Sequence, residues 1–141
     1  MLLLGEKYQD IRGKLTYNNE FNATVIKRIY TIENISIDFI RGWQGHQVEQ
    51  RWFAAMTGSF EISVIKIDNF GNPSDSLAVV KYVLTADELT YLHVEKGHVT
   101  AIQALEKDSK LLVLADYSLG EIQDEIRYSI EYFKNAVFNT I

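Results

Sequence analysis

Three polar side chains at one end of an apolar segment are the first candidates for chemistry in this sequence. Read with the two-residue period of a strand, Gln44, His46 and Gln50 share a face with Trp52 and Met56. Burial of two amides and an imidazole costs free energy unless they have hydrogen-bond partners. A polar end on an inward face therefore indicates a solvated pocket. The alternative is an edge strand whose polar end reaches solvent, and the pattern leaves both open.

The elements that must position these side chains are predominantly strands. Segments rich in β-branched and aromatic residues recur along the chain, separated by clusters of Gly, Asn, Asp and Ser, which is typical of an all-β sandwich or barrel. The sequence Thr57-Gly58-Ser59 predicts a tight hairpin turn. The predicted strands are residues 14–17, 24–32, 47–56, 60–68, 77–84, 91–94, 100–105 and 110–115.

The C-terminal segment alone has the spacing of an α-helix. Five apolar residues recur there at intervals of four, four, three and four, which places them on one side of a helix. Ser118 followed by Glu121 predicts a capping box at its start. We therefore expect a C-terminal α-helix whose apolar side packs on the barrel or on a partner subunit. Its apolar residues are Ile122, Ile126, Ile130, Phe133 and Val137.

Length and charge limit the classes of partner. The 141 residues, 47% of them hydrophobic, fit one domain over residues 1–141. The 14 basic and 19 acidic residues give a net charge of −5, which disfavours nucleic acid as a partner but allows a small anionic ligand. Without cysteine, disulfides and thiolate metal sites are excluded. The apolar run at residues 1–4 is too short for a signal peptide or a membrane span, so we expect a cytoplasmic protein.

Several short segments together resemble a known family. Residues 10–15 (DIRGKL), 27–30 (KRIY) and 41–46 (RGWQGH) are similar, in order and spacing, to D-x-R-G-x-L, K-R-x-Y and R-G-x-H-A-H of the WxcM-like sugar-nucleotide 3,4-ketoisomerases. Residues 84–88, 92–97 and 116–128 also resemble the related dTDP-4-dehydrorhamnose 3,5-epimerases. The resemblance extends from about residue 8 to about residue 133. It implies a cupin, that is a double-stranded β-helix or jelly-roll barrel, which binds a nucleotide sugar and forms a homodimer.

The departures from the family pattern concern the catalytic residues. Gln44 stands where the first histidine of R-G-x-H-A-H is expected, and an amide cannot take a proton from a sugar carbon. The tyrosine that acts as the acid in the epimerases falls near Leu112. Epimerisation by the histidine base and tyrosine acid of the epimerases is therefore not expected. The second histidine is retained as His46, which favours isomerisation of a dTDP-4-keto-6-deoxyhexose through an enediol.

The resemblance assigns candidate roles to individual residues. His46 would shuttle the proton, with Tyr30 as an acid and Gln44 as a donor to a substrate oxygen. Arg41 and Arg12 are candidates for the diphosphate, because a guanidinium matches paired phosphate oxygens. Simpler alternatives are an Arg41 pair with Asp38, a core role for Tyr30, and a His46 hydrogen bond to Gln50. Gln50 and Trp52 complete the predicted substrate-binding set.

The metal ligands of many cupins are incomplete in this sequence. Many cupins bind a metal with two early histidines, a glutamate and a late histidine. Here Gln44 and His46 stand at the two early positions, Glu49 is too close to them in sequence to match the usual glutamate, and Thr100 replaces the late histidine. We therefore expect neither a metal nor another cofactor. His93 and His98 are expected at the surface or in a loop, although His98 would enter the pocket if the loop shifts register.

Three functions remain open from the sequence. The first is an active sugar-nucleotide isomerase or epimerase. The second is a protein that binds a nucleotide sugar without turnover, which the changes at Gln44, Thr100 and Leu112 suggest. The third is a structural or regulatory cupin without a small ligand, which would require a barrel interior closed by side chains such as Trp52 and Met56.

Overall fold

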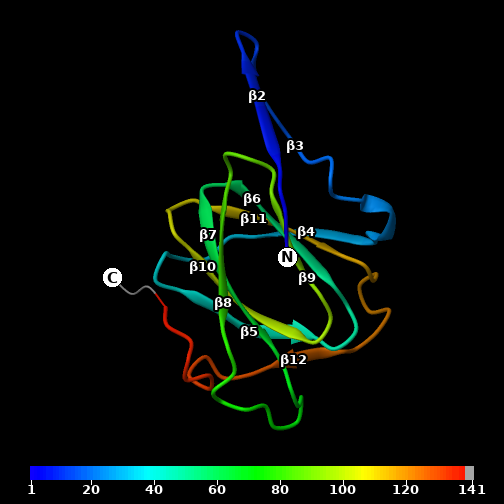
Figure 1. Cartoon of the computed structure of the whole chain (residues 1–141), viewed down its shortest axis with the longest axis vertical. Coiled ribbons are helices and arrows are strands. Elements are labelled where there is room, and N and C mark those ends of the chain that lie inside the picture. Colours follow the sequence, from blue (N-terminus) through cyan, green and yellow to red (C-terminus); the bar gives the residue numbers. More distant parts are fainter. Residues whose placement is uncertain (139–141) are drawn as a thin grey trace.

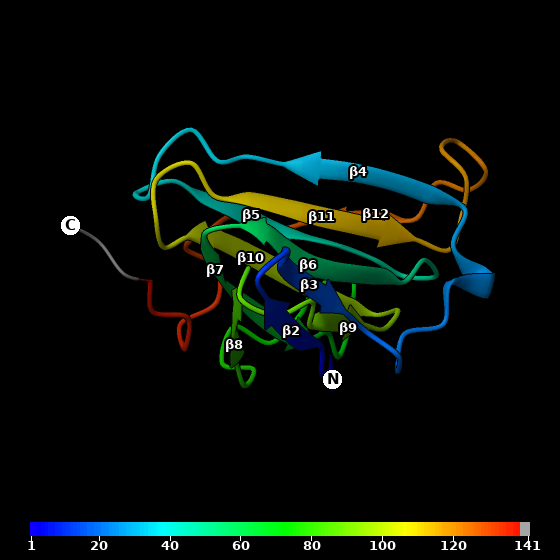
Figure 2. The same ribbon diagram turned by 90° about the horizontal axis from the view of Figure 1, so that it is seen from above.

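Two five-stranded antiparallel sheets make up the body of the protein. The computed structural model describes residues 1–138 of the chain. The first sheet has the order β1 (Leu2–Leu3), β9 (Tyr91–Val94), β6 (Arg51–Thr57), β11 (Lys110–Ala115) and β4 (Arg28–Ile32). The second has the order β12 (Glu125–Arg127), β5 (Ile40–His46), β10 (His98–Ala104), β7 (Ser59–Lys66) and β8 (Val80–Thr85). Figures 1 and 2 show the two layers.

The two sheets share one apolar core, so they form the jelly roll that the sequence predicts. Phe53 and Leu111 of the first sheet pack with Phe60, Ile62 and Ile102 of the second, and each is at most 4% exposed. Every strand pair is antiparallel. Within residues 1–138, no helix is long and apolar enough to cross a membrane.

A hairpin of β2 (Glu6–Asp10) and β3 (Gly13–Tyr17) extends away from this body at the top of Figure 1. It forms a separate two-stranded sheet, and Ile11 at its turn is fully exposed. A short 3₁₀ helix, η1 (Ala23–Val25), then leads into β4. The predicted strand at residues 24–32 is therefore shorter than expected, because Asn22 caps this helix by accepting a hydrogen bond from the backbone of Thr24.

The expected common face of Gln44 and Trp52 is wrong. Strand β5 ends at His46 and β6 begins at Arg51, so an irregular connection over residues 47–50 breaks the period of two. After this break, Phe53 points into the core, whereas Trp52 packs outside the first sheet with Phe21 and Tyr91. A two-residue pattern predicts faces only while the chain stays extended.

The predicted C-terminal helix is also wrong, because residues 1–138 contain no α-helix. A spacing of four residues returns to the same face of a strand as well as of a helix, so Ile122, Ile126 and Ile130 fit both. The backbone instead pairs with β5, where Ile126 lies opposite Gly45. Further along, Trp43 and Tyr128 exchange both of their backbone hydrogen bonds.

The residues expected to cap that helix close a turn instead. The backbone of Glu121 donates to the carbonyl of Ser118, and its side chain accepts from the Ser118 backbone at 3.4 Å. Gly120 lies between them with a φ of 79°, a conformation that favours glycine. The local capping contacts therefore form, but no helix follows them.

The segment after β12 covers the outer face of the second sheet. Phe133 is 2% exposed and packs edge-on against Trp43, with ring centroids 5.4 Å apart. The hydroxyls of Tyr128 and Tyr132 donate to the carbonyls of Phe70 and Pro73 in the loop after β7. Of the apolar residues predicted to cover the barrel, Ile126, Ile130 and Phe133 do so in an irregular strap rather than a helix, whereas Val137 is 68% exposed.

Candidate active site

A cavity of about 520 Å³ opens between the sheets at the ends of β4, β5 and β10. Four of the predicted site residues line it: Tyr30, Arg41, Gln44 and His46. The polar end of β5 therefore faces a pocket, which decides between the two alternatives left by the sequence. The interior is also not closed by Trp52 or Met56, neither of which lines this cavity.

The wall on the second sheet is set by strand register. His46 lies between Glu125 of β12 and His98 of β10, and all three line the cavity. Two residues earlier on β5, Gln44 lies between Arg127 and Thr100, and these three residues also line the cavity. Directly opposed residues in an antiparallel pair project to the same face. The wall is therefore two parallel rows of polar side chains.

Two glycines allow β5 to approach β10 closely enough to form this wall. A Cβ at Gly45 would lie 2.0 Å from the carbonyl oxygen of His98. A Cβ at Gly42 would lie 2.7 Å from the Cα of Ala101. Both distances are far below van der Waals contact, so these positions of the R-G-W-Q-G-H segment require glycine for space.

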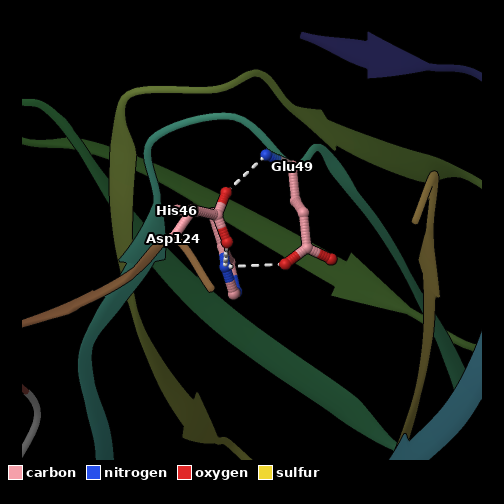
Figure 3. A group of neighbouring side chains, drawn as sticks. All are labelled: His46, Glu49 and Asp124. Carbon is pink, nitrogen blue, oxygen red and sulfur yellow. Dashed lines mark hydrogen bonds and ion pairs between the residues drawn. The ribbon is translucent and has the colours of Figure 1, made fainter. Parts of the chain in front are cut away.

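His46 is held at both ring nitrogens. Its Nδ1 lies 2.9 Å from Oδ1 of Asp124, and its Nε2 lies 2.9 Å from Nη2 of Arg51. Because a guanidinium can only donate, Nε2 must accept, and Nδ1 therefore carries the proton that it donates to Asp124. Figure 3 shows the carboxylates of Asp124 and Glu49 on the side of Nδ1.

The charged groups around this ring, two carboxylates and one guanidinium, are buried. The side chains of Glu49, Asp124 and Arg51 are only 7%, 7% and 8% exposed. Arg51 Nη1 lies 3.1 Å from Oε1 of Glu49, and Glu49 Oε2 lies 3.3 Å from His46 Nδ1. Burial and the neighbouring Asp124 raise the pKa of Glu49, and Arg51 opposes this effect.

Asp124 also fixes the connection between β5 and β6. Its Oδ2 accepts from the backbone N–H groups of Val48 and Glu49, at 2.8 and 2.7 Å. Burial alone would raise the pKa of Asp124, but these hydrogen bonds and the one from His46 together lower it well below the ordinary value. Asp124 is therefore an ionised residue that positions both the imidazole and the turn that follows it.

The same residues include a set of donor atoms that suits a metal ion. Ligand atoms of His46, Glu49 and Asp124 lie within 4.8 Å of one another. A metal could bind Nδ1 only after loss of the proton that Nδ1 now donates to Asp124, and Nε2 is engaged by Arg51. The buried guanidinium of Arg51 supplies positive charge next to the two carboxylates, so the set is one buried ionic and hydrogen-bonded network.

The other predicted site residues lie away from the cavity. Arg12 is at the tip of the β2–β3 hairpin, where its side chain is 82% exposed and pairs with Asp10 at 2.7 Å. Gln50 is held by Asp116 through its backbone and side chain at 2.8 and 3.1 Å. It also contacts His93, so the alternative of a His46–Gln50 hydrogen bond is wrong.

Trp52 belongs to the outer face of the first sheet. Its ring stacks on His93 with centroids 4.5 Å apart. Leu112 packs against the same outer cluster. Neither residue lines the cavity: the break before β6 directs Trp52 outward, and Leu112 of β11 lies opposite Ala54 on the same outer face.

Four residues of the site were not predicted from the sequence. The two-residue period places Arg51 and Glu49 on the face opposite Gln44 and His46, and the helical spacing places Asp124 in a helix. His98 enters the cavity wall without a shift of register, because it is directly opposite His46. The charge of Arg51 within an otherwise apolar strand was the one available signal for a buried ionic site.

Fold and site together define a jelly-roll protein with a polar cavity at one end of the barrel. The FdtA, WxcM-like C-terminal family model matches residues 3–137, and the chain belongs to this family. No curated protein matches the chain.

Solved structures with the same fold include three 3,4-ketoisomerases. One from Helicobacter canadensis is 26% identical, with 95% of this chain and 94% of that chain covered and a TM-score of 0.70. The TDP-fucose-3,4-ketoisomerase WlaRA from Campylobacter jejuni is 25% identical, with 94% and 91% covered and a TM-score of 0.68. A histidine-to-asparagine mutant of QdtA from Thermoanaerobacterium thermosaccharolyticum, in complex with TDP-4-keto-6-deoxyglucose, is 23% identical, with 96% and 92% covered and a TM-score of 0.70.

Proposed function

We propose that this protein is a sugar-nucleotide 3,4-ketoisomerase that acts on a dTDP-4-keto-6-deoxyhexose. The observation that carries the proposal is the position of His46, an imidazole in the cavity wall whose far nitrogen is held by the buried carboxylate of Asp124 at 2.9 Å. A carboxylate behind an imidazole orients the ring and stabilises the imidazolium that forms when the ring takes a proton. The family and the three similar ketoisomerases support the same kind of reaction.

The reaction transfers one proton between neighbouring carbons. His46 Nε2 takes the proton from C3, the C–H electrons form the C3–C4 double bond, and the C4 carbonyl electrons move to oxygen as an enediolate. The proton of the C3 hydroxyl then passes to the C4 oxygen while C3 becomes the carbonyl and C4 receives a proton. No oxidant or reductant is needed. Tyr30, which lines the cavity, is the proposed acid for the sugar oxygens.

Arg51 must move for this step to begin. Its Nη2 now donates to His46 Nε2, the atom that would accept the substrate proton. When Nη2 turns to the developing oxygen anion, it frees the lone pair of His46 and stabilises the new charge in one movement.

The remaining cavity residues suit the other parts of a nucleotide sugar. Arg41 is exposed in the cavity wall and can bind a diphosphate, and Gln44 can donate to a sugar oxygen. Arg12 lies far from the cavity of its own chain, so its proposed diphosphate contact requires a partner copy. This is consistent with a homodimer, which we propose as the assembly.

A second candidate function is binding of the nucleotide sugar without turnover. Two observations favour it: Gln44 cannot transfer a proton, and both nitrogens of His46 are engaged. In this case Arg51 would stay on His46 after the ligand binds.

Incubation with TDP-4-keto-6-deoxyglucose in deuterium oxide, followed by NMR, tests the proposal. We expect deuterium at C3 of the substrate and at C4 of a 3-keto product, and loss of both in His46→Asn. An asparagine there can still donate to Asp124, so the turn is retained. Calorimetric binding of the sugar nucleotide without exchange would establish the second candidate, and absence of binding would refute both.

A further inference from the structure

His98 has one ring nitrogen that the protein leaves available. Its Nδ1 lies 3.1 Å from the carbonyl oxygens of both Glu95 and Lys96. Because carbonyls only accept, Nδ1 carries the proton, and Nε2 of the neutral ring is an acceptor. Within residues 1–138, no hydrogen bond to Nε2 competes for it. The turn at residues 95–97 therefore fixes both the orientation and the tautomer of this imidazole.

The position of His98 places this nitrogen next to the proposed chemistry. His98 lies directly opposite His46 across the β5–β10 ladder, on the same face of the sheet. It lines the main cavity and also a second cavity of about 320 Å³, and the two meet at Val94, Glu95 and His98. A sugar that contacts His46 therefore has His98 as its neighbour on the next strand.

The other candidates for a second proton carrier are less suited. Gln44 stands one row away on the same wall, and its amide acts as neither an acid nor a base near neutral pH. Both nitrogens of His46 are engaged, and its Nε2 becomes available only when Arg51 turns away. Of the imidazoles in the main cavity wall, His98 alone combines a fixed ring with an available nitrogen within residues 1–138.

We propose that His98 is a second catalytic residue, which delivers the proton to C4 after His46 has taken the one from C3. This inference rests on the proposed ketoisomerase function. The imidazolium form of His98 donates from Nε2 to C4, and the electrons of that N–H bond remain on the ring as its lone pair. The half-buried ring then regains a proton from solvent. Two carbonyls hold the Nδ1 proton throughout, so only Nε2 exchanges.

The test separates the two half-reactions with His98→Asn. An asparagine amide can occupy the place of Nδ1 and donate to the same carbonyls, while the position of Nε2 is lost. We expect deuterium exchange at C3 of TDP-4-keto-6-deoxyglucose to stay within about threefold of the wild-type rate, while formation of the 3-keto product falls at least about 100-fold. His46→Asn should lose both. Lys96→Gln, a change in the same turn with an exposed side chain, should keep both.

Each contrary outcome identifies what has failed. Normal product formation by His98→Asn would overturn the role of His98 and leave the ketoisomerase function standing. A rise in KM with unchanged kcat would mean that His98 only binds the sugar, and equal loss of exchange and product would mean that it does not act in the second half-reaction alone. If the wild-type protein showed neither exchange nor product, the ketoisomerase function itself would be refuted.

Discussion

Arg51 Nη2 lies 2.9 Å from Nε2 of His46, while its Nη1 lies 3.1 Å from a carboxylate oxygen of Glu49. The guanidinium therefore joins the proposed base to a buried acid. A charge in this environment is stable only with its partners in place, since removal of one leaves the other desolvated and unpaired. The same contact orients His46 in the resting protein and must be exchanged for a contact with substrate during the reaction.

The first prediction concerns the stability of this network. Arg51→Gln should lower the free energy of unfolding by about 3 kcal/mol, because it leaves Glu49 without its cation. The loss should increase between pH 5 and pH 8. Burial already raises the pKa of Glu49, so at the lower pH the unpaired carboxyl can take up a proton instead. Urea unfolding at both pH values measures the effect.

The matched control is the double variant Glu49→Gln with Arg51→Gln. Removal of both charges leaves two amides in place of an ion pair, and most of the lost stability should return. Additive effects of the two substitutions would show that the pair contributes no coupling.

The second prediction concerns acid stability. The pKa of Asp124 is lowered in the folded protein, so its contribution is fully present above the unfolded pKa, near 3.8, and is lost as the pH falls below it. Asp124→Asn should cost about 2 kcal/mol at pH 6, by loss of hydrogen bonds to a charged group, and progressively less below pH 4.

Unfolding of both proteins at pH 6 and pH 3 checks this sign. Glu125→Gln, at the neighbouring exposed position, is the control and should leave the pH dependence unchanged. A difference between wild type and Asp124→Asn that grew at pH 3 would contradict the assignment.

The β-rich core could be predicted from sequence, because alternation and turn residues are local signals. The polar end of β5 fitted both a pocket and a solvent-exposed edge, and only the fold selects the pocket. The errors arose where a pattern fits two structures. The four-residue spacing of Ile122, Ile126 and Ile130 suits either an extended chain or a helix. Only the pairing of β12 with β5 places Ile126 in a strand, and the other two lie outside it. That choice placed Asp124 beside His46, a contact between residues 78 positions apart that no local pattern contains.

The prediction that Gln50 and Trp52 line the cavity is wrong for a related reason. It requires a strand period of two through residues 47–50, where the chain is not extended. Asp124 holds this connection through the backbone of Val48 and Glu49. The faces of β6 are therefore determined by a distant carboxylate. Once this break is known, the buried position of Arg51 and the outward position of Trp52 follow together.

The third prediction concerns the glycine that brings the two histidines together. Gly45→Ala should destabilise the protein and reduce any activity, because its methyl group would meet the His98 carbonyl oxygen at 2.0 Å and push β5 away from β10. We expect a fall in the melting temperature of at least several degrees, measured by circular dichroism.

Gly71→Ala is the control, since a methyl group there approaches only the Asn69 side chain, at 3.7 Å, in an exposed loop. It should change the melting temperature little. Equal effects of the two substitutions would mean that loss of glycine flexibility, rather than the clash between β5 and β10, determines the result.

The fourth prediction concerns the C-terminal strap that covers the second sheet. Phe133→Ala removes a ring that is 2% exposed and packs edge-on against Trp43, so it should lower the free energy of unfolding by about 3 to 5 kcal/mol. Val137→Ala, in the same strap but 68% exposed, should have an effect below about 0.5 kcal/mol. Because β5 carries Trp43 on one face and Gln44 and His46 on the other, loosening of the strap should also weaken sugar-nucleotide binding. A Phe133→Ala protein of normal stability would show that the strap is not part of the core.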